Sequence, residues 1–186
     1  MNKDVLKDFA DQLGVDPAVV EDRWKGRPDL IAEDIFQIQD IDTGEVGDLQ
    51  LFEAQRKAIH AYFYGDAHKI NNYKGRRIGY SFVYCVAFLL EGMFIPNSFY
   101  PFVARKYGQA ENRVGDIQKL IKHARVDIPV EVNNKGEVEL WNGSTFEAFS
   151  ANPDAERGDD PARAVMLDEM AFMEDHKPES LQKFRV

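Results

Sequence analysis

The sequence contains a single cysteine, Cys85, and no long hydrophobic run. One thiol excludes an internal disulfide framework or a cysteine metal site, so we interpret Cys85 as a small core residue. The most apolar stretch, residues 82–95, is interrupted by Glu91 and Gly92 and is too short to span a bilayer. The first residues also lack the apolar core of a secretion signal. These shortages predict a cytoplasmic protein.

Positive charge is also in short supply, with 23 Lys and Arg against 32 Asp and Glu and a formal net charge of −9. Such a surface does not attract nucleic acid as a whole, so any contact with DNA must be local. The four histidines show no metal-ligand spacing. With 186 residues, 44% hydrophobic and 30% charged, the chain is long and apolar enough for a folded core.

Apolar periodicity and turn residues predict an alternation of helices and strands. Helices are expected over residues 3–13, 16–38, 52–63, 81–90 and 109–123. Strands are expected over residues 68–74, 99–104, 130–132, 138–141, 145–149 and 164–167, with a loop over 40–48. This order predicts an α/β fold, in which helices flank a largely parallel sheet and the strands between 130 and 149 form a small antiparallel meander.

The stretch from Lys74 to Ser81, KGRRIGYS, is close to the phosphate-binding pattern G-x-x-x-x-G-K-[ST]. Gly79 and Ser81 match its last glycine and its hydroxyl, but Tyr80 stands where the lysine belongs. Glycines let backbone N–H groups face phosphate, and the following helix directs its N-terminus at the anion. Other positions of the loop supply cations: Lys74, Arg76 and Arg77. A basic surface loop is the alternative interpretation.

Two further features favour a nucleotide site. The apolar strand at 164–167 ends in Asp168 and Glu169. An aspartate at such a strand end can bind Mg²⁺, and the next glutamate can activate the attacking water as general base. Upstream of the loop, Gln55 carries an amide whose donor and acceptor suit an adenine edge. A polar helix residue is the alternative for Gln55.

In this order, the residues resemble the ATPase domain of viral, bacteriophage-type terminase large subunits, the motors that drive DNA into a procapsid. The resemblance covers residues 49–175. Its motifs between the loop and Asp168 include Phe102-Val103-Ala104, Gln109-Ala110-Glu111, Asn142-Gly143-Ser144, Ser150-Ala151-Asn152-Pro153 and Arg157-Gly158. After the strand, Met170-Ala171-Phe172 completes the most specific part.

The resemblance implies a P-loop NTPase fold of the ASCE type, with ATP and Mg²⁺ as cofactors. The loop is similar to the deviant Walker A motif of the lambda-like branch, whose lysine opens the motif. The implied nucleotide-binding residues are Gln55, Lys74, Gly75, Arg76, Arg77, Ile78, Gly79, Tyr80 and Ser81. Lys74 and Glu169 are the implied catalytic residues, and Ser81 and the Walker B residue Asp168 the implied metal ligands. Arg157 either senses phosphate or anchors its loop.

Residues 1–45 are expected to form an N-terminal helical segment, and residues 46–186 the ATPase core. Terminase large subunits continue beyond the metal-binding strand with further strands, a coupling motif and a nuclease domain, for which little sequence remains before Val186. We therefore expect a truncated core without a nuclease, and an incomplete sheet is one alternative. A truncated form, one piece of a split terminase and a decayed gene all remain open.

The resemblance implies ATP hydrolysis coupled to DNA translocation, in the host cytoplasm and without a membrane. The implied partners are double-stranded DNA, the portal protein of the procapsid, the small terminase subunit and further copies of the chain in a ring. Two alternatives are a hydrolysis-incompetent nucleotide-binding or assembly fragment and another DNA-dependent P-loop ATPase. Met170-Ala171-Phe172 argues against a helicase-like ATPase.

Overall fold

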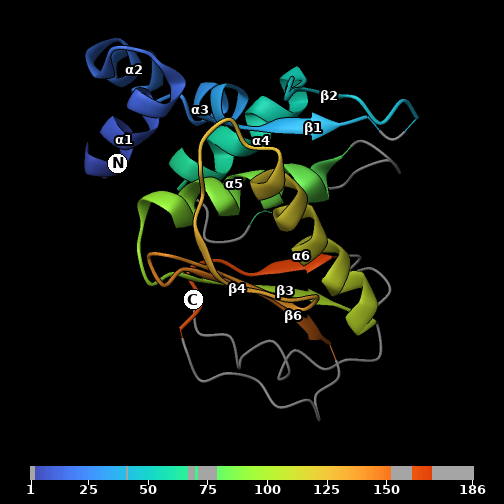
Figure 1. The fold of residues 1–186 in the computed structure, drawn as a ribbon. Helices are drawn as coiled ribbons and strands as arrows, with labels where there is room; N and C mark the ends of the chain where they lie inside the picture. Colours follow the sequence, from blue (N-terminus) through green and yellow to red (C-terminus); the bar gives the residue numbers. More distant parts are fainter. Residues whose placement is uncertain (1–2, 41, 67–69, 71–78, 152–160, 169–186) are drawn as a thin grey trace. The chain divides into compact units, whose positions relative to one another are not determined.

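The chain divides into two compact units, residues 1–94 with 119–128 and residues 95–118 with 129–186 (Figure 1). The computed structural model describes residues 3–40, 42–66, 70, 79–151 and 161–168. Helices and strands alternate through this part of the chain, and the α/β class expected from the sequence is confirmed. The predicted division between residues 45 and 46 stays a prediction.

Helices dominate the first unit (Figure 1). They are α1 (Lys3–Leu13), α2 (Pro17–Trp24), α3 (Pro28–Ile35), α4 (Glu53–Tyr64) and α5 (Tyr80–Phe94). Successive helices pack on one another, and α3 contacts both α4 and α5. The helix expected over 16–38 is two helices, because Gly26 adopts a left-handed φ of 67° after α2 and Pro28 opens α3.

The segment after α3 is a hairpin and not the helix end and loop that the sequence predicted. Strand β1 (Gln37–Gln39) pairs antiparallel with β2 (Val46–Asp48). In the turn, the Asp40 carboxylate accepts two backbone N–H groups, at 2.8 and 2.9 Å, and Gly44 adopts a φ of 74°. This turn chemistry stabilises the hairpin and outweighs the helical spacing of the apolar residues up to Ile38.

A mixed five-stranded sheet forms the second unit, in the order β4-β5-β6-β3-β7. Its strands are β3 (Phe99–Ala104), β4 (Val130–Asn133), β5 (Glu137–Leu140), β6 (Thr145–Ser150) and β7 (Met166–Asp168). β3 is parallel to β6 and β7, and the meander β4-β5-β6 is antiparallel as predicted. The meander joins the parallel strands through β6. The strand predicted at 68–74 falls almost wholly outside the described residues.

The central strand β3 is buried from Tyr100 to Ala104, as expected for a strand with neighbours on both sides. It contains a proline, Pro101, which has no backbone N–H. The carbonyls of Ser98 and Ala104 accept hydrogen bonds from the β6 side, whereas the carbonyl of Phe99 accepts one from Arg163. This alternation directs the backbone nitrogen of Pro101 toward β7, which pairs with β3 only beyond that residue.

Each unit has its own apolar core. In the first unit α5 is almost entirely buried, including Cys85, which confirms its interpretation as a core residue. Glu91, the acid within this helix, accepts a hydrogen bond from the hydroxyl of Tyr62. In the second unit the rings of Tyr100 and Phe146 stack across β3 and β6, with centroids 5.1 Å apart. This pair stabilises the junction between the meander and the parallel strands.

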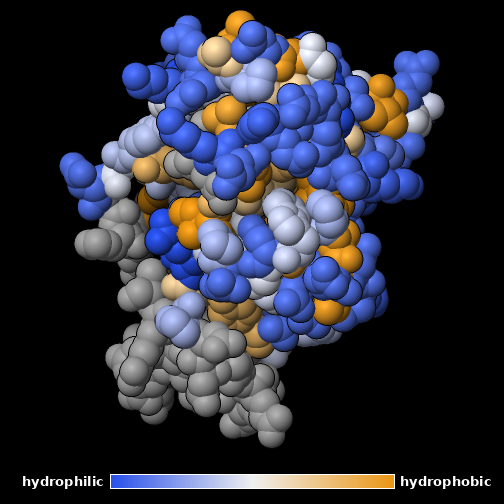
Figure 2. Space-filling view, turned by 60° about the vertical axis from the view of Figure 1, so that its left-hand side comes forward, coloured by the Kyte–Doolittle hydropathy of each residue, from blue (hydrophilic) through white to orange (hydrophobic). Residues whose placement is uncertain are grey.

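The face in Figure 2 is mostly hydrophilic, with hydrophobic residues in small areas between the polar ones. Among the described residues, no helix combines the length and apolar character that crossing a membrane requires.

Helix α6 (Tyr107–Lys122) begins in the second unit and ends in residues grouped with the first.

The Asn142-Gly143-Ser144 turn anchors the start of β3. Ser144 is fully buried, and its hydroxyl donates to the carbonyl of Ile95 at 2.9 Å. Gly143 has a φ of 77°, and a Cβ there would lie 2.5 Å from the side-chain oxygen of Asn97. This turn, part of the resemblance to terminases, therefore has a structural role in the second unit.

We predict opposite effects for two glycine-to-alanine substitutions in this unit. Gly143→Ala lowers the free energy of unfolding by about 1–2 kcal/mol, because alanine resists a left-handed backbone. Gly115→Ala, in the middle of α6 with no atom within 4 Å of the added Cβ, raises it by about 0.5–1 kcal/mol. Urea unfolding measures both, and equal effects of the two substitutions would contradict the prediction.

Candidate functional site

The structure describes five of the residues that the sequence assigns to a nucleotide site. Four belong to the first unit and one, Asp168, to the second. The four are Gln55, Gly79, Tyr80 and Ser81. The remaining predicted residues lie outside the described part of the chain: Lys74, Gly75, Arg76, Arg77, Ile78, Arg157 and Glu169. Their roles stay predictions.

Gly79 forms the junction between the predicted phosphate loop and helix α5. Its carbonyl accepts the first helical hydrogen bond from Val83 N–H at 3.0 Å, so it is the N-cap residue of the helix. Its φ of 78° is one that glycine adopts without strain. Tyr80 and Ser81 follow in the first turn, where N–H groups lack helical partners and favour an anion. The described end of the predicted loop is therefore a glycine followed by a helix N-terminus, and its role in phosphate binding stays a prediction.

Gln55 lies against this junction, although α4 and the loop are separate in sequence. A Cβ at Gly79 would lie 3.0 Å from the side-chain nitrogen of Gln55. The hydroxyl of Tyr80 is 3.5 Å from the carbonyl oxygen of Ala54, next to Gln55. The structure thus places the predicted base-reading residue beside Gly79, at the described end of the predicted loop. A side chain at position 79 would strain the left-handed backbone and press on the Gln55 amide.

The orientation of the Gln55 side chain follows from its own helix. Phe52 is the N-cap residue of α4, and its N–H donates to the side-chain oxygen of Gln55 at 3.0 Å. Because this N–H needs an acceptor, the amide oxygen faces Phe52 and the amide NH₂ faces Gly79. Gln55 is only 8% exposed, so the amide has little freedom to turn. Its position is set by the start of α4.

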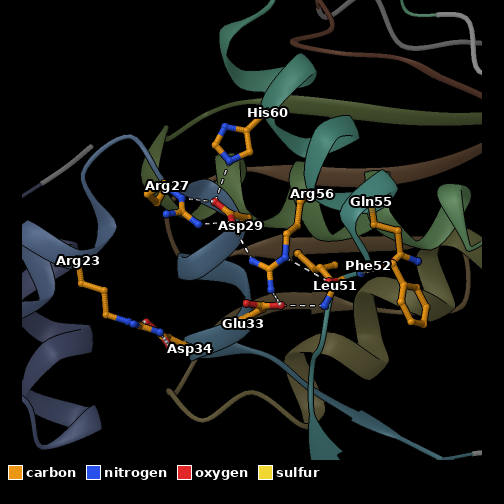
Figure 3. Close-up of polar contacts among 10 residues, drawn as sticks. All are labelled: Arg23, Arg27, Asp29, Glu33, Asp34, Leu51, Phe52, Gln55, Arg56 and His60. Carbon is orange, nitrogen blue, oxygen red and sulfur yellow. Dashed lines mark hydrogen bonds and ion pairs between the residues drawn. The ribbon is translucent and has the colours of Figure 1, made fainter.

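A charged cluster that the sequence did not reveal surrounds the start of α4 (Figure 3). Arg56 donates to Asp29 at 2.9 Å, to Glu33 at 2.6 Å and to the carbonyl of Leu51 at 3.2 Å. Glu33 also accepts the N–H of Leu51 at 2.8 Å. The one usable signal in the sequence is that Asp29 and Glu33 are four residues apart, which places them on one face of a helix.

Asp29 is the most buried member of this cluster, with 1% of its side chain exposed. It accepts hydrogen bonds from Arg27 at 2.8 and 3.0 Å and contacts a ring nitrogen of His60 at 2.8 Å. Burial by itself raises the pKa of the Asp29 carboxyl, but the bonds from Arg27, His60 and Arg56 lower that pKa well below the usual range. Asp29 is therefore a charged group at neutral pH.

In the second unit, Asp168 belongs to β7 and pairs with Ala104 of β3; it is the last residue that the structure describes. Its carboxylate lies 3.7 Å from Nε of Arg113 on α6, and Arg113 also pairs with Asp116 at 3.1 Å. The side chains of Arg113 and Asp168 are 21% and 16% exposed. Sequence reasoning placed Asp168 at the end of this strand; the structure has it on β7, and the position of the strand end stays a prediction because residue 169 lies outside the described residues. It did not identify Arg113 as its neighbour.

The residue types present fit a magnesium nucleotide. Mg²⁺ in such sites takes one or two protein oxygens together with phosphate oxygens and water, so it needs no dense carboxylate cluster. The described residues hold no group of three or more His, Cys, Asp or Glu suited to a metal ion. Ser81 offers a hydroxyl in the first unit and Asp168 a carboxylate in the second. Their joint use at one ion stays a prediction.

Residues 54–185 match the family model described as "Terminase large subunit, ATPase domain". The match includes Gln55, the loop from Lys74 to Ser81, and Asp168. A comparison with curated proteins finds no significant match. Because the family model covers most of the chain, the resemblance read from the motifs is confirmed. The chain belongs to the family of terminase large subunit ATPase domains.

Proposed function

We propose that this chain binds ATP with Mg²⁺ and hydrolyses it as the motor ATPase of a DNA-packaging terminase. The observation that carries the proposal is the proximity of the Gln55 amide to Gly79 at the start of α5, where an added Cβ would lie 3.0 Å from the amide nitrogen. A base-reading amide and a helix N-terminus at one place are what an adenine nucleotide needs, since its base and phosphates are bound together. The family supports ATPase activity in general.

The roles of individual residues follow from this proposal. The backbone of residues 75–80 surrounds the phosphates, and Lys74, at the front of the loop, supplies the charge that a lysine at position 80 would provide. Arg76 or Arg77 adds charge at the γ-phosphate. Ser81 and Asp168 hold Mg²⁺, which neutralises the developing charge on the phosphates.

Glu169 follows Asp168 directly and is the general base that polarises the attacking water. Arg157, upstream of the strand, is the candidate for sensing the γ-phosphate. Arg113 balances the charge of Asp168 when no metal is bound, because its Nε lies 3.7 Å from that carboxylate. A metal ion at Asp168 therefore competes with Arg113.

The proposed partners are those of a packaging motor. They are double-stranded DNA, the portal protein of the procapsid, the small terminase subunit and further copies of the chain in a ring. With a formal net charge of −9, the contact with DNA is confined to a local basic surface, and the assembled ring supplies several copies of it. A nucleotide-binding assembly fragment without turnover is the competing function.

We predict that Lys74→Ala lowers ATP affinity about tenfold or more, because it removes a charge-assisted bond to phosphate. Glu169→Gln keeps affinity but lowers turnover by about a hundredfold, the usual contribution of a general base. Titration of a fluorescent ATP analogue and phosphate release measure the two effects. Lys57→Ala is the matched control, since the side chain of this lysine is 75% exposed and, within the described part of the chain, its ion pair is with Glu53 on the same helix.

Unchanged ATP affinity in Lys74→Ala would show that Lys74 does not take the role of the lysine that the usual motif has at position 80. Binding without turnover in the wild-type chain would favour the assembly fragment. No binding of ATP by the wild-type chain would refute both functions.

A second prediction concerns Arg113. Arg113→Gln lowers the Mg²⁺ concentration for half-maximal ATP hydrolysis about fivefold, because the ion no longer competes with a nearby guanidinium worth about 1 kcal/mol. A magnesium titration of phosphate release measures the shift. Lys122→Gln removes the same charge from the far end of α6 and should leave the titration unchanged. A higher magnesium requirement in Arg113→Gln would mean that Arg113 orients Asp168 for the metal.

A further inference from the structure

The charged cluster of Figure 3 fixes the segment that leads into Gln55. Both backbone polar groups of Leu51 are held by it: the N–H by Glu33 at 2.8 Å and the carbonyl by Arg56 at 3.2 Å. The next residue, Phe52, donates its N–H to the side chain of Gln55 at 3.0 Å. Hydrogen bonds from α3 and Arg56 therefore hold Leu51, and the peptide bond from Leu51 to Phe52 carries the N–H that binds the amide of Gln55.

The cluster resists displacement because of its burial and charge. Asp29 and Glu33 are 1% and 15% exposed, and Arg56 bridges them with separate nitrogens at 2.9 and 2.6 Å. Burial alone would lower the pKa of Arg56, but its bonds to the two carboxylates raise it. Without the guanidinium, the Glu33 carboxylate would lose its cation, and Asp29 would lose one partner while keeping Arg27 and His60, so the contact between α3 and α4 would weaken there.

A second arginine–carboxylate pair in the same segment lacks this connection. Arg23 contacts Asp34 through two nitrogens at 2.6 and 2.8 Å, and the indole N–H of Trp24 donates to the same carboxylate at 2.8 Å. This pair joins α2 to the end of α3, and Figure 3 shows it apart from Arg56. It has the same chemistry as the Arg56 contacts but no bond to Leu51 or α4.

We propose that Arg56 is a positioning residue for base recognition, and that Asp29 and Glu33 of α3 hold it in place to orient the amide of Gln55. The inference rests on the proposed function, in which Gln55 reads the base of ATP. It assigns helix α3 a part in nucleotide selectivity, although residues 28–35 lie outside the family match that begins at residue 54.

The consequence is specific to the base. Hydrogen bonds from an amide to a base edge depend on direction, so a small rotation of Gln55 loses them. The triphosphate is bound by backbone N–H groups and cations, whose attraction falls off gradually with distance. Loss of Arg56 should therefore reduce discrimination between ATP and GTP more than it reduces binding of the phosphate chain.

Competition against a fluorescent ATP analogue, with ATP, GTP and inorganic tripolyphosphate as competitors, tests this on the full chain. We expect wild type to prefer ATP to GTP, and Gln55→Ala to abolish that preference. Arg56→Gln should lower the preference about tenfold while tripolyphosphate affinity changes less than about twofold. Glu33→Gln should give a smaller loss in the same direction. Arg56→Lys should rescue only part, because an ammonium lacks the fork that reaches three acceptors.

Arg23→Gln is the matched control. It removes an arginine–carboxylate pair from the same segment, so it should lower the melting temperature but keep the preference for ATP. Equal losses for ATP, GTP and tripolyphosphate in the Arg56 variants would reduce Arg56 to a purely structural role and overturn the inference. If Arg56→Gln does not fold, Arg56→Lys and Glu33→Gln test the inference by the same comparison, the preference for ATP over GTP set against the affinity for tripolyphosphate.

The outcomes also separate the inference from the proposed function. A wild-type chain that binds no ATP refutes the proposed function, and the inference with it. A wild-type chain that binds ATP and GTP equally leaves ATP binding intact but overturns base reading and the role of Arg56. Preserved preference in the Arg56 variants, with loss in Gln55→Ala, overturns the inference alone.

Discussion

Asp29 carries a negative charge where only 1% of its side chain meets solvent, and the first unit is arranged around the need to balance that charge. Arg27 supplies one partner from the residue before α3, and Arg56 and His60 supply two more from α4. Since burial raises the pKa of the carboxyl and these bonds lower it, the charged form is stable in this buried position because Arg27, Arg56 and His60 surround it. The stabilisation is present at neutral pH and is lost as the pH falls through the lowered pKa of the folded state.

The ion pairs between α3 and α4 also determine the position of Gln55. The start of α4 is fixed by α3, Gln55 is fixed by the start of α4, and Gln55 lies against the glycine that opens α5. The side chain that is proposed to read the base is therefore held from the protein side before a nucleotide arrives. Such preorganisation reduces the conformational entropy that binding would otherwise have to overcome.

Helices and strands with an uninterrupted local pattern of apolar and polar residues could be predicted from the sequence. Helix α5 and strand β3 could be predicted because each is a continuous apolar run, and the meander because its strands alternate apolar and polar residues. The hairpin after α3 could not, because its strands are three residues each and depend on a turn held by Asp40. Hydrogen bonds in a turn leave no apolar periodicity in the sequence from which the hairpin could be predicted.

The candidate site divides in the same way. Gln55, Gly79 and Asp168 carry motif or composition signals, and the structure has Gln55 on α4, Gly79 just before α5 and Asp168 on β7. Arg56 and Arg113 carry none, since an arginine on a helix is usually a solvated side chain. Their partners lie on other elements, and one sequence does not state which charges meet after folding. The association of distant ion pairs requires the tertiary structure.

Pro101 gives the second unit a fixed register. If β7 moved by two residues toward the start of β3, a carbonyl of β7 would face the proline nitrogen and lack a donor, at a cost of about 1–3 kcal/mol. Movement in the opposite direction would carry its last residue past Ala104, where β3 ends. One imino acid thus limits sliding of β7 in one direction, and the end of β3 limits it in the other. The register that places Asp168 opposite Ala104 therefore begins one residue after a proline that has no hydrogen-bond donor to offer β7.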